Sequence, residues 1–269
     1  MPFVAILGAG PLGGALAHAL ASRSRFDAVR LIDPAKTLAA GKALDILQAG
    51  PVDGSSTRVT GHATLEAADG AWAILLADPV EPDPLTHLQQ VHRRSPAAVI
   101  VCADATHQIP LARAVATGAV PPDRLVGSAP FAAASAARAL LALAMDVSPA
   151  VIDVGVSGCD TGHAPCGIDW ARTAIDGEPA ETAVQRGVRA RLDARVDASW
   201  PPGPLTLASA GARVAEAAWF GARHAFPCWW VTDGGHTPPG VHRLRFAAGG
   251  RARAVGTAGG VGAAPGSGR

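Results

Sequence analysis

The sequence has almost no net charge of either sign. Its 269 residues carry 23 Lys and Arg against 22 Asp and Glu, which gives a formal net charge of +1. A nucleic-acid-binding surface needs an excess of Lys and Arg to neutralise phosphates, so this balance argues against a nucleic-acid partner. Tyrosine is missing, and Lys36 and Lys42 are the only lysines. We attribute this bias, and the abundance of alanine and arginine, to genome composition.

Cysteines are few and widely spaced. Four of them in a chain of this length do not form the framework of a small disulfide-rich domain. We therefore expect reduced thiols in a cytoplasmic protein. Hydrophobic residues make up 49% of the chain and charged residues 17%, which excludes a disordered protein and is ample for a buried core. The cysteines are Cys102, Cys159, Cys166 and Cys228.

A long uninterrupted apolar run is also lacking. Residues 3–20 are apolar, but glycines and a proline interrupt them and no basic segment precedes them, so we reject a signal peptide. Residues 131–147 carry Arg138 near their centre and fall short of the ~20 residues that a membrane span needs. We expect a buried amphipathic helix there and no membrane partner.

Short apolar strands alternate with helical patterns through the first half of the chain. Continuous apolar strands separated by helices are typical of a parallel sheet that is covered on both faces. Right-handed crossovers then predict an α/β fold, a doubly wound parallel Rossmann sheet over residues 1–129. The expected strands are residues 3–7, 29–32, 59–62, 72–77, 97–103 and 125–127, and the expected helices are 11–23, 36–48, 85–94 and 109–117.

The second half has a different pattern, which predicts a smaller α+β substrate-type domain over residues 130–248. An antiparallel pair is expected to close it around the turn Asp233-Gly234-Gly235. Residues 249–269 are Gly, Ala and Arg with almost no large apolar side chain, and we expect a disordered tail. The expected helices are 131–145, 179–196 and 205–220, and the expected strands are 150–156, 170–175, 226–231 and 241–246.

The segment Gly8-Ala9-Gly10-Pro11-Leu12-Gly13 matches the pattern G-x-G-x-x-G between a predicted strand and a predicted helix. Gly8 permits a tight turn, Gly10 lets a pyrophosphate approach the backbone, and Gly13 lets helix and strand pack closely. The helix N-terminus adds free N–H groups and the positive end of a dipole. We assign the three glycines, with Pro11 and Leu12, to a dinucleotide-binding turn.

Asp33 ends the second predicted strand, twenty residues after Gly13. A carboxylate there accepts hydrogen bonds from the adenosine ribose hydroxyls and repels the 2′-phosphate of NADP. The next residue is Pro34 rather than an arginine, so we expect NAD rather than NADP. The alternative is a glycine-rich turn in an α/β fold that binds nothing.

Together with the glycine turn and Asp33, the segment Gly41-Lys42-Ala43-Leu44-Asp45-Ile46-Leu47-Gln48 resembles the malate/lactate dehydrogenase family, and its malate branch in particular. Residues 125–128 and 156–158 extend the resemblance, which spans about residues 3 to 246. It implies NAD as cofactor, hydride transfer on a small 2-hydroxy or 2-keto acid, and a homodimer or homotetramer. It also adds Ala77, Cys102 and Asp104 to the expected cofactor-binding residues.

The resemblance further implies catalytic groups that this sequence lacks. The family's orienting Asp and its carboxylate-binding Arg fall on Ala133 and Ala136, and its acid/base His falls on Asp160. Its Asn after the fifth strand falls on Asp104. Its mobile loop, whose Arg polarises the substrate carbonyl, falls on residues 78–84, which hold three acids and no Arg. We therefore expect that the reaction is lost or changed.

Two interpretations stay open for these residues. Asp160 and His163 are the candidate catalytic residues, as a replacement acid/base pair for a neutral or cationic substrate, or else they are only a polar loop pair. Cys159, His163 and Cys166 are metal-ligand types, but their spacing fits no standard zinc pattern, and we expect no metal. The chain is then either an active NAD-dependent oxidoreductase or a non-catalytic NAD-binding paralogue with a structural, sensing or partner role.

Overall fold

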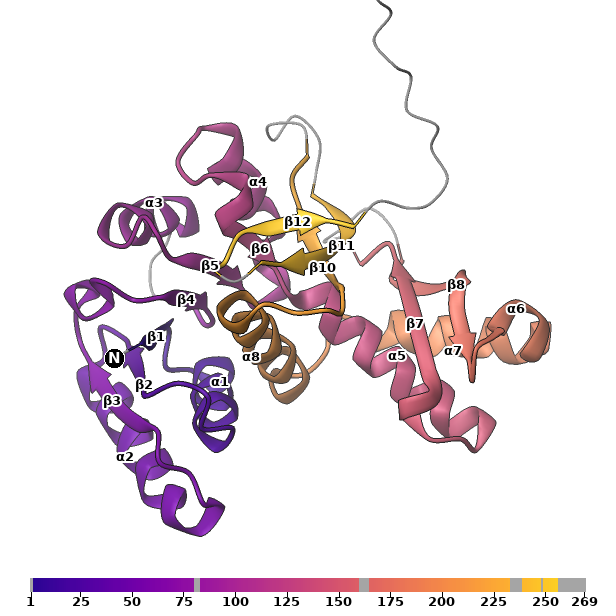
Figure 1. Ribbon diagram of the computed structural model, residues 1–269, viewed down its shortest axis with the longest axis horizontal. Coiled ribbons are helices and arrows are strands. Elements are labelled where there is room, and N and C mark those ends of the chain that lie inside the picture. The colour runs from indigo at the N-terminus through magenta and orange to yellow at the C-terminus, as the bar shows by residue number, and fades with distance from the viewer. Residues whose placement is uncertain (1, 80–82, 160–164, 233–238, 248, 256–269) are drawn as a thin grey trace, which may run out of the picture.

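A mostly parallel sheet of nine strands forms the centre of the computed structural model, which describes residues 2–79, 83–159, 165–232, 239–247 and 249–255. The strand order is β12-β11-β10-β6-β5-β4-β1-β2-β3, and the six strands from β6 to β3 run parallel (Figure 1). They are β1 (Phe3–Leu7), β2 (Ala28–Ile32), β3 (Arg58–His62), β4 (Ala73–Leu76), β5 (Val99–Cys102) and β6 (Leu125–Gly127). The expected doubly wound α/β sheet is confirmed.

Helices cover both faces of this sheet. On one face α1 packs against α2 and α8, and on the other α3 packs against α4 (Figure 1). Every residue of β4 and β5 is buried, as expected of strands covered on both sides. The helices are α1 (Pro11–Ser22), α2 (Lys36–Asp53), α3 (Pro84–Arg94), α4 (Gln108–Ala116) and α8 (Pro204–Phe220), with short 3-10 turns η1 (Leu65–Ala68), η2 (Ala105–His107) and η3 (Pro122–Arg124).

The last strands of the chain return to the first sheet. β10 (Phe226–Trp230) lies antiparallel to β6, with Trp229 opposite Gly127, and β11 (Gly240–Phe246) pairs with β10 as expected. β12 (Ala252–Ala254) then pairs with β11. The expectation of a disordered tail from residue 249 is therefore wrong for residues 249–255, because backbone hydrogen bonding to β11 does not require large apolar side chains. The turn expected at residues 233–235 lies outside the described residues.

A second, smaller unit is built around the helix α5, which follows β6. It holds a three-stranded antiparallel sheet in the order β7-β8-β9, packed against α5 and α7. The single helix expected over 179–196 is instead two helices, because Val184 is extended and buried between them. The elements are α5 (Ala129–Met145), η4 (Pro149–Val151), β7 (Ile152–Ser157), β8 (Gly167–Ile175), β9 (Glu178–Pro179), α6 (Ala180–Ala183) and α7 (Arg186–Ala198).

The hydrophobic cores divide the chain differently from the expected boundary after residue 129. One core joins the first 132 residues to residues 207–252, and the other holds residues 133–196. The second unit is therefore an insertion between two parts of the larger one. Among the described helices, none is both long and apolar enough to cross a membrane.

Cys159 and Cys166 form a disulfide, which corrects the expectation of four reduced thiols. Cys159 lies two residues after β7 and Cys166 directly precedes β8. Because β7 and β8 run antiparallel, these positions face each other, with Cα atoms 4.0 Å apart. Cys102 and Cys228 are free and buried.

Candidate functional site

The predicted cofactor residues gather at one edge of the parallel sheet. Gly8 follows β1, Asp33 follows β2, and Ala77 follows β4, while Asp104 lies two residues after β5. The register pairs Leu7 with both Ile32 and Leu76, so the carboxyl ends of these strands lie side by side. In open α/β sheets ligands bind at this edge, where the strand order reverses. The structure thus brings together residues that are far apart in the sequence.

The glycine turn has the geometry that the sequence predicts. Gly8 has a φ of +94°, a left-handed conformation that favours glycine. A Cβ on Gly13 would lie 2.8 Å from the carbonyl carbon of Gly8, so α1 packs closely on the turn only because Gly13 has no side chain. The Nζ of Lys42 donates to the carbonyl of Gly10 at 2.6 Å. Lys42 therefore ties α2 to the glycine turn.

Asp33 is tied to the same turn by its carboxylate. Its Oδ2 accepts from the backbone N–H of Ala9 and its Oδ1 from that of Ala35, both at 2.8 Å. These two hydrogen bonds fix the carboxylate at the end of β2 beside the glycine turn. Asp33 as a whole is half-buried.

Asp78 was not predicted to contact the turn, yet its carboxylate lies on it. Oδ1 accepts from the backbone N–H of Leu12 at 3.1 Å, and Oδ2 accepts from that of Gly13 at 2.7 Å. Both donors belong to the first turn of α1, where N–H groups have no partner within the helix. Two signals could have suggested this contact: the helix begins after Gly10, which has no side chain to cap it, and β4 is the neighbour of β1 in the sheet.

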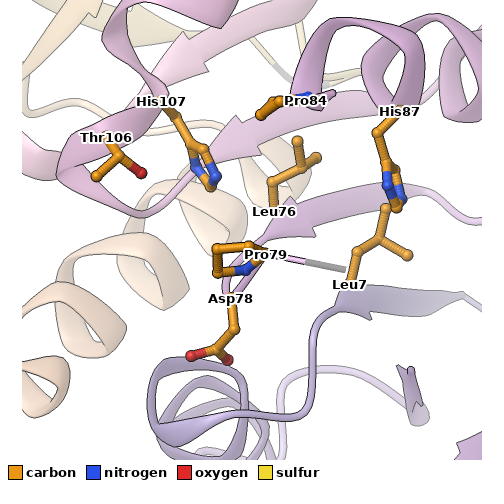
Figure 2. A pocket seen from close by; sticks show the side chains of 8 residues that line it. All are labelled: Leu7, Leu76, Asp78, Pro79, Pro84, His87, Thr106 and His107. Atoms are coloured by element: carbon orange, nitrogen blue, oxygen red, sulfur yellow. The ribbon is translucent and has the colours of Figure 1, made fainter. Parts of the chain in front are cut away.

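A cavity opens beside Asp78 (Figure 2). Burial lowers the pKa of His107 in its wall, and His87 lowers it further, against the opposing effects of Asp104 and Asp78. The imidazole of His107 is therefore neutral at physiological pH. None of the lining residues among the described part of the chain is an Arg or a Lys. They are Leu7, Leu76, Asp78, Pro79, Pro84, His87, Thr106 and His107.

Two acids of this region have local structural roles. Asp104 Oδ1 accepts from the backbone N–H of Thr106 at 2.8 Å and from its hydroxyl at 2.6 Å, which caps η2. Asp83 caps α3 by accepting from the N–H groups of Leu85 and Thr86, and the hydroxyl of Thr86 lowers the pKa of the Asp83 carboxyl. Both carboxylates are therefore committed to helix starts, in addition to making this edge acidic.

Ala77 and Cys102 pack inside the sheet. Both are fully buried, and burial raises the pKa of the Cys102 thiol to about 12, so the thiol stays neutral. The N–H of Ala77 donates to the carbonyl of Leu7, and the carbonyl of Cys102 accepts from the N–H of Ser128. Their assignment as cofactor contacts stays a prediction.

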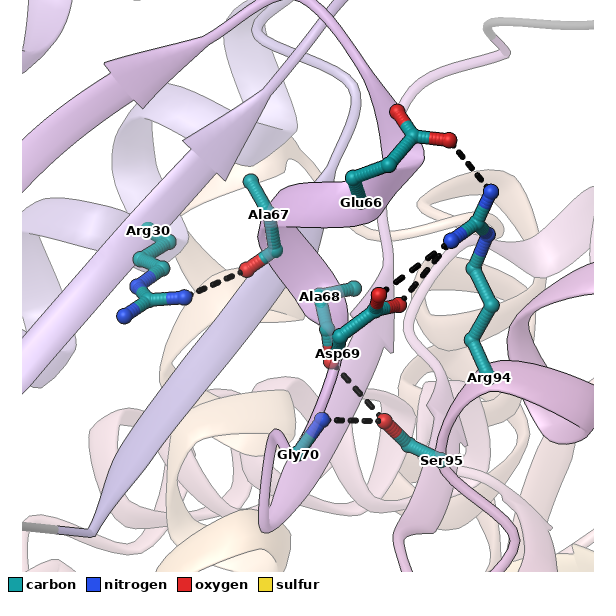
Figure 3. Close-up of polar contacts among 8 residues, drawn as sticks. All are labelled: Arg30, Glu66, Ala67, Ala68, Asp69, Gly70, Arg94 and Ser95. Atoms are coloured by element: carbon teal, nitrogen blue, oxygen red, sulfur yellow. Dashed lines mark hydrogen bonds and ion pairs between the residues drawn. The ribbon is translucent and has the colours of Figure 1, made fainter.

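A second cavity lies at the same edge, beside the carboxyl ends of β1 and β2. Arg94, in its wall, forms ion pairs with Glu66 and with Asp69, the latter at 3.1 Å (Figure 3). Its guanidinium is thereby matched by two carboxylates between η1 and α3, which favours a structural role over anion binding. The cavity is lined by Leu7, Ile32, Pro34, Ala63, Thr64, Leu65, Glu66, His87, Gln90 and Arg94.

The positions expected for substrate chemistry carry no suitable group where the structure describes them. Ala133 is buried and Ala136 half-buried on α5, and neither offers a charge. Asp160 and His163, the candidate acid/base pair, lie outside the described residues. Cys159 and Cys166 are joined in a disulfide, so their sulfurs are not available as metal ligands. Within the described ranges no group of three or more His, Cys, Asp or Glu could hold a metal.

Comparisons with known sequences give partial-length relatives. No protein-family model matches the chain. A malate dehydrogenase of Thermomicrobium roseum is 33% identical over 192 residues, which cover 65% of this chain and 61% of that protein. A malate dehydrogenase of Pelagibacter ubique is 27% identical over 203 residues, covering 70% of this chain and 62% of its own length. The matches thus span about three fifths of the length of these curated relatives.

Solved structures with the same fold cover nearly all of the chain. The malate dehydrogenase of Salinibacter ruber superposes with a TM-score of 0.85 at 20% identity, covering 96% of this chain and 90% of its own. A lactate dehydrogenase of Cryptosporidium parvum, complexed with lactic acid and nicotinamide adenine dinucleotide, gives 0.79 at 17% identity, covering 95% and 90%. At these identities the likeness shows the fold.

Proposed function

We propose that the chain belongs to the malate/lactate dehydrogenase family and that it binds NAD(H) over the turn between β1 and α1. The observation that carries the proposal is the approach of Asp33 to the glycine turn at the carboxyl edge of the sheet. That arrangement is the one in which a doubly wound sheet binds a dinucleotide. The lactate dehydrogenase neighbour of the same fold holds this cofactor.

The residues present fit the adenosine half of the cofactor. Asp33 would accept hydrogen bonds from the adenosine ribose hydroxyls, and its charge would repel the 2′-phosphate of NADP. The N–H groups of Leu12 and Gly13 would donate to the pyrophosphate at the start of α1. When bound, the nicotinamide would supply the hydride chemistry. Asp78 now accepts from those same N–H groups, a conflict that bears on affinity.

For the reaction, we propose that hydride transfer on an anionic 2-keto acid is lost or changed. Arg and Lys are absent from the described lining of the cavity at Asp78, which instead holds a carboxylate and two imidazoles. Two outcomes are open, as at the level of sequence. The protein reduces a neutral or cationic carbonyl compound, or it is a non-catalytic NAD(H)-binding paralogue, which Ala133 and Ala136 favour. The expected homodimer or homotetramer and the cytoplasmic location stay predictions.

One set of assays separates an active reductase from a non-catalytic NAD(H)-binding protein. NADH is titrated by its fluorescence, and its absorbance is then followed with oxaloacetate, pyruvate, neutral ketones, and aldehydes. We expect saturable binding and no turnover of the two keto acids at ordinary dehydrogenase rates. Turnover of either keto acid at such rates would contradict the loss of the family reaction. The Asp33→Ala variant tests the location of the site, because its NADH binding should weaken while the fold persists.

A further inference from the structure

We propose that Asp78 is an intramolecular competitor of the dinucleotide pyrophosphate and thereby sets which ligands this site accepts. The inference rests on the proposed function and deepens it. Its basis is that a carboxylate of the chain lies on the backbone N–H groups that a phosphate would need. Asp78 is thus a specificity-determining residue rather than only an acid in a loop.

Carboxylates of the chain occupy the backbone donors of the turn. At the start of α1 the Leu12 and Gly13 N–H groups donate to the two carboxylate oxygens of Asp78, at 3.1 and 2.7 Å. The Ala9 N–H, at the top of the same turn, donates to Asp33. The described turn therefore has its main donors matched by the chain's own carboxylates. Negative charge at a helix N-terminus is stabilised by the helix dipole, so the contact is favourable in the free protein.

Asp78 also fills the space that the glycines of the turn leave open. A Cβ on Gly8 would lie 2.6 Å from the backbone N of Asp78, and a Cβ on Gly10 would lie 2.9 Å from the Cβ of Asp78. A Cβ on Gly13 would lie 3.0 Å from Asp78 Oδ2. The room that glycines keep open for a pyrophosphate in a dinucleotide fold is here filled by this one residue.

A pyrophosphate and the Asp78 carboxylate cannot share these donors. Both are anions that accept hydrogen bonds from the same N–H groups, and two negative charges side by side repel each other. The dinucleotide therefore binds only when the Asp78 side chain leaves the start of α1. Its binding free energy is less favourable by the free energy of the contact between Asp78 and α1. A ligand without a pyrophosphate, such as adenosine, meets only the end of β2 and is insensitive to Asp78.

This difference gives the test. Dissociation constants for ADP-ribose and adenosine are measured by calorimetry on the full chain and on the Asp78→Ala and Asp78→Asn variants. We expect ADP-ribose to bind roughly tenfold or more tightly to Asp78→Ala than to the unmodified chain, from loss of a carboxylate held at a helix N-terminus. The dissociation constant for adenosine should change by less than about twofold, because adenosine lacks the competing phosphates.

Asp53→Asn is the matched control, because Asp53 is an exposed carboxylate at the far end of α2. It removes the same charge and should leave ADP-ribose binding unchanged. Asp78→Asn keeps the size of the side chain and should also tighten ADP-ribose binding, which guards against misfolding of Asp78→Ala. Circular dichroism of each variant reports whether the fold persists.

The possible failures are distinguishable. If ADP-ribose binds the unmodified chain and the folded Asp78 variants equally, the competitor role is wrong and dinucleotide binding stands. If the Asp78 variants bind adenosine more tightly by the same factor as ADP-ribose, Asp78 acts on the whole site and the proposed competition with phosphate is overturned. If neither the unmodified chain nor either folded variant binds ADP-ribose, the proposed function fails, and with it the inference.

Discussion

We propose that the choice between NAD and NADP depends on Asp33. Its carboxylate is held by the N–H groups of Ala9 and Ala35, so it cannot swing away from a ligand without losing two hydrogen bonds. We predict that the chain binds NADH more tightly than NADPH, because a fixed negative charge repels the 2′-phosphate. In Asp33→Ala this preference should shrink by tenfold or more, about 1.4 kcal/mol. Equal preference before and after the substitution, in parallel fluorescence titrations, would contradict this role.

His107 should make stability depend on pH. Burial lowers its pKa in the folded protein below the ordinary value of about 6.5, so the folded state keeps it neutral while the unfolded chain takes up a proton. Stability is then fully present above about pH 6.5 and is lost as pH falls below it, by at most ~1.4 kcal/mol per pH unit.

The measurement is urea denaturation at pH 7.5 and 5.5. We predict that His107→Gln loses less stability between these pH values than the unmodified chain does. His18→Gln, at an exposed position on α1, serves as control and should keep the full pH dependence. An unaltered pH dependence in His107→Gln would show that other groups cause it.

At this scale the sequence predicted local relationships better than distant ones. Gly8, Gly13 and Asp33 could be assigned because the motif and the spacing to the next strand are read along one βαβ unit. The contact of Asp78 with Gly13 joins residues 65 apart and depends on the order of strands in the sheet. No local pattern encodes that order, so Asp78 could only be placed in an acidic loop.

The helix α2 packs closely on the strand β3 near the site. A Cβ on Gly61, in β3, would lie 2.5 Å from the backbone N of Ala40 in α2. Backbone cannot move away as a side-chain tip can, so we predict that Gly61→Ala destabilises the fold by about 1–3 kcal/mol. The check is the midpoint of urea denaturation.

Gly41 in the same helix supplies the opposite case. A Cβ there would meet no atom within 4 Å, and the residue is exposed. Gly41→Ala should therefore stabilise the protein by about 0.5–1 kcal/mol, because alanine loses less backbone freedom on forming a helix. If Gly61→Ala raises the urea midpoint as Gly41→Ala does, the close packing of α2 on β3 does not require a glycine at position 61.

The disulfide between β7 and β8 predicts a count of free thiols. Alkylation of the purified protein under denaturing, non-reducing conditions should modify Cys102 and Cys228 only, as measured by mass spectrometry. After reduction all four cysteines should react. Modification of four cysteines without reduction would mean that Cys159 and Cys166 are unpaired in the isolated protein.

Elements were predicted where pattern and burial agree. The buried strands β4 and β5 are continuous apolar runs, and their assignment from the sequence is confirmed. The break at Val184 between α6 and α7 was missed, because a single buried valine in an otherwise charged segment leaves the helical pattern intact. β12 was missed because its few small and charged residues give no strand pattern of their own.

On the scale of the whole molecule, the two hydrophobic cores divide the chain differently from the boundary expected after residue 129. Local composition changes near residue 130, but the chain returns to its first core through α8 and β10. The return depends on Trp229 packing over Gly127, where a Cβ would lie 2.7 Å from the indole ring. A pairing between residues 102 positions apart is decided by tertiary packing, which a reading along the chain does not reveal.

We propose above that this molecule holds NAD(H) at the turn between β1 and α1, and calorimetry of NADH binding with ADP-ribose as competitor tests this most directly. We predict one saturable site per chain, displaced by ADP-ribose and weakened in Asp33→Ala. The absence of saturable NADH binding, both in the unmodified chain and in folded Asp78→Ala, would contradict an NAD(H) site at this turn.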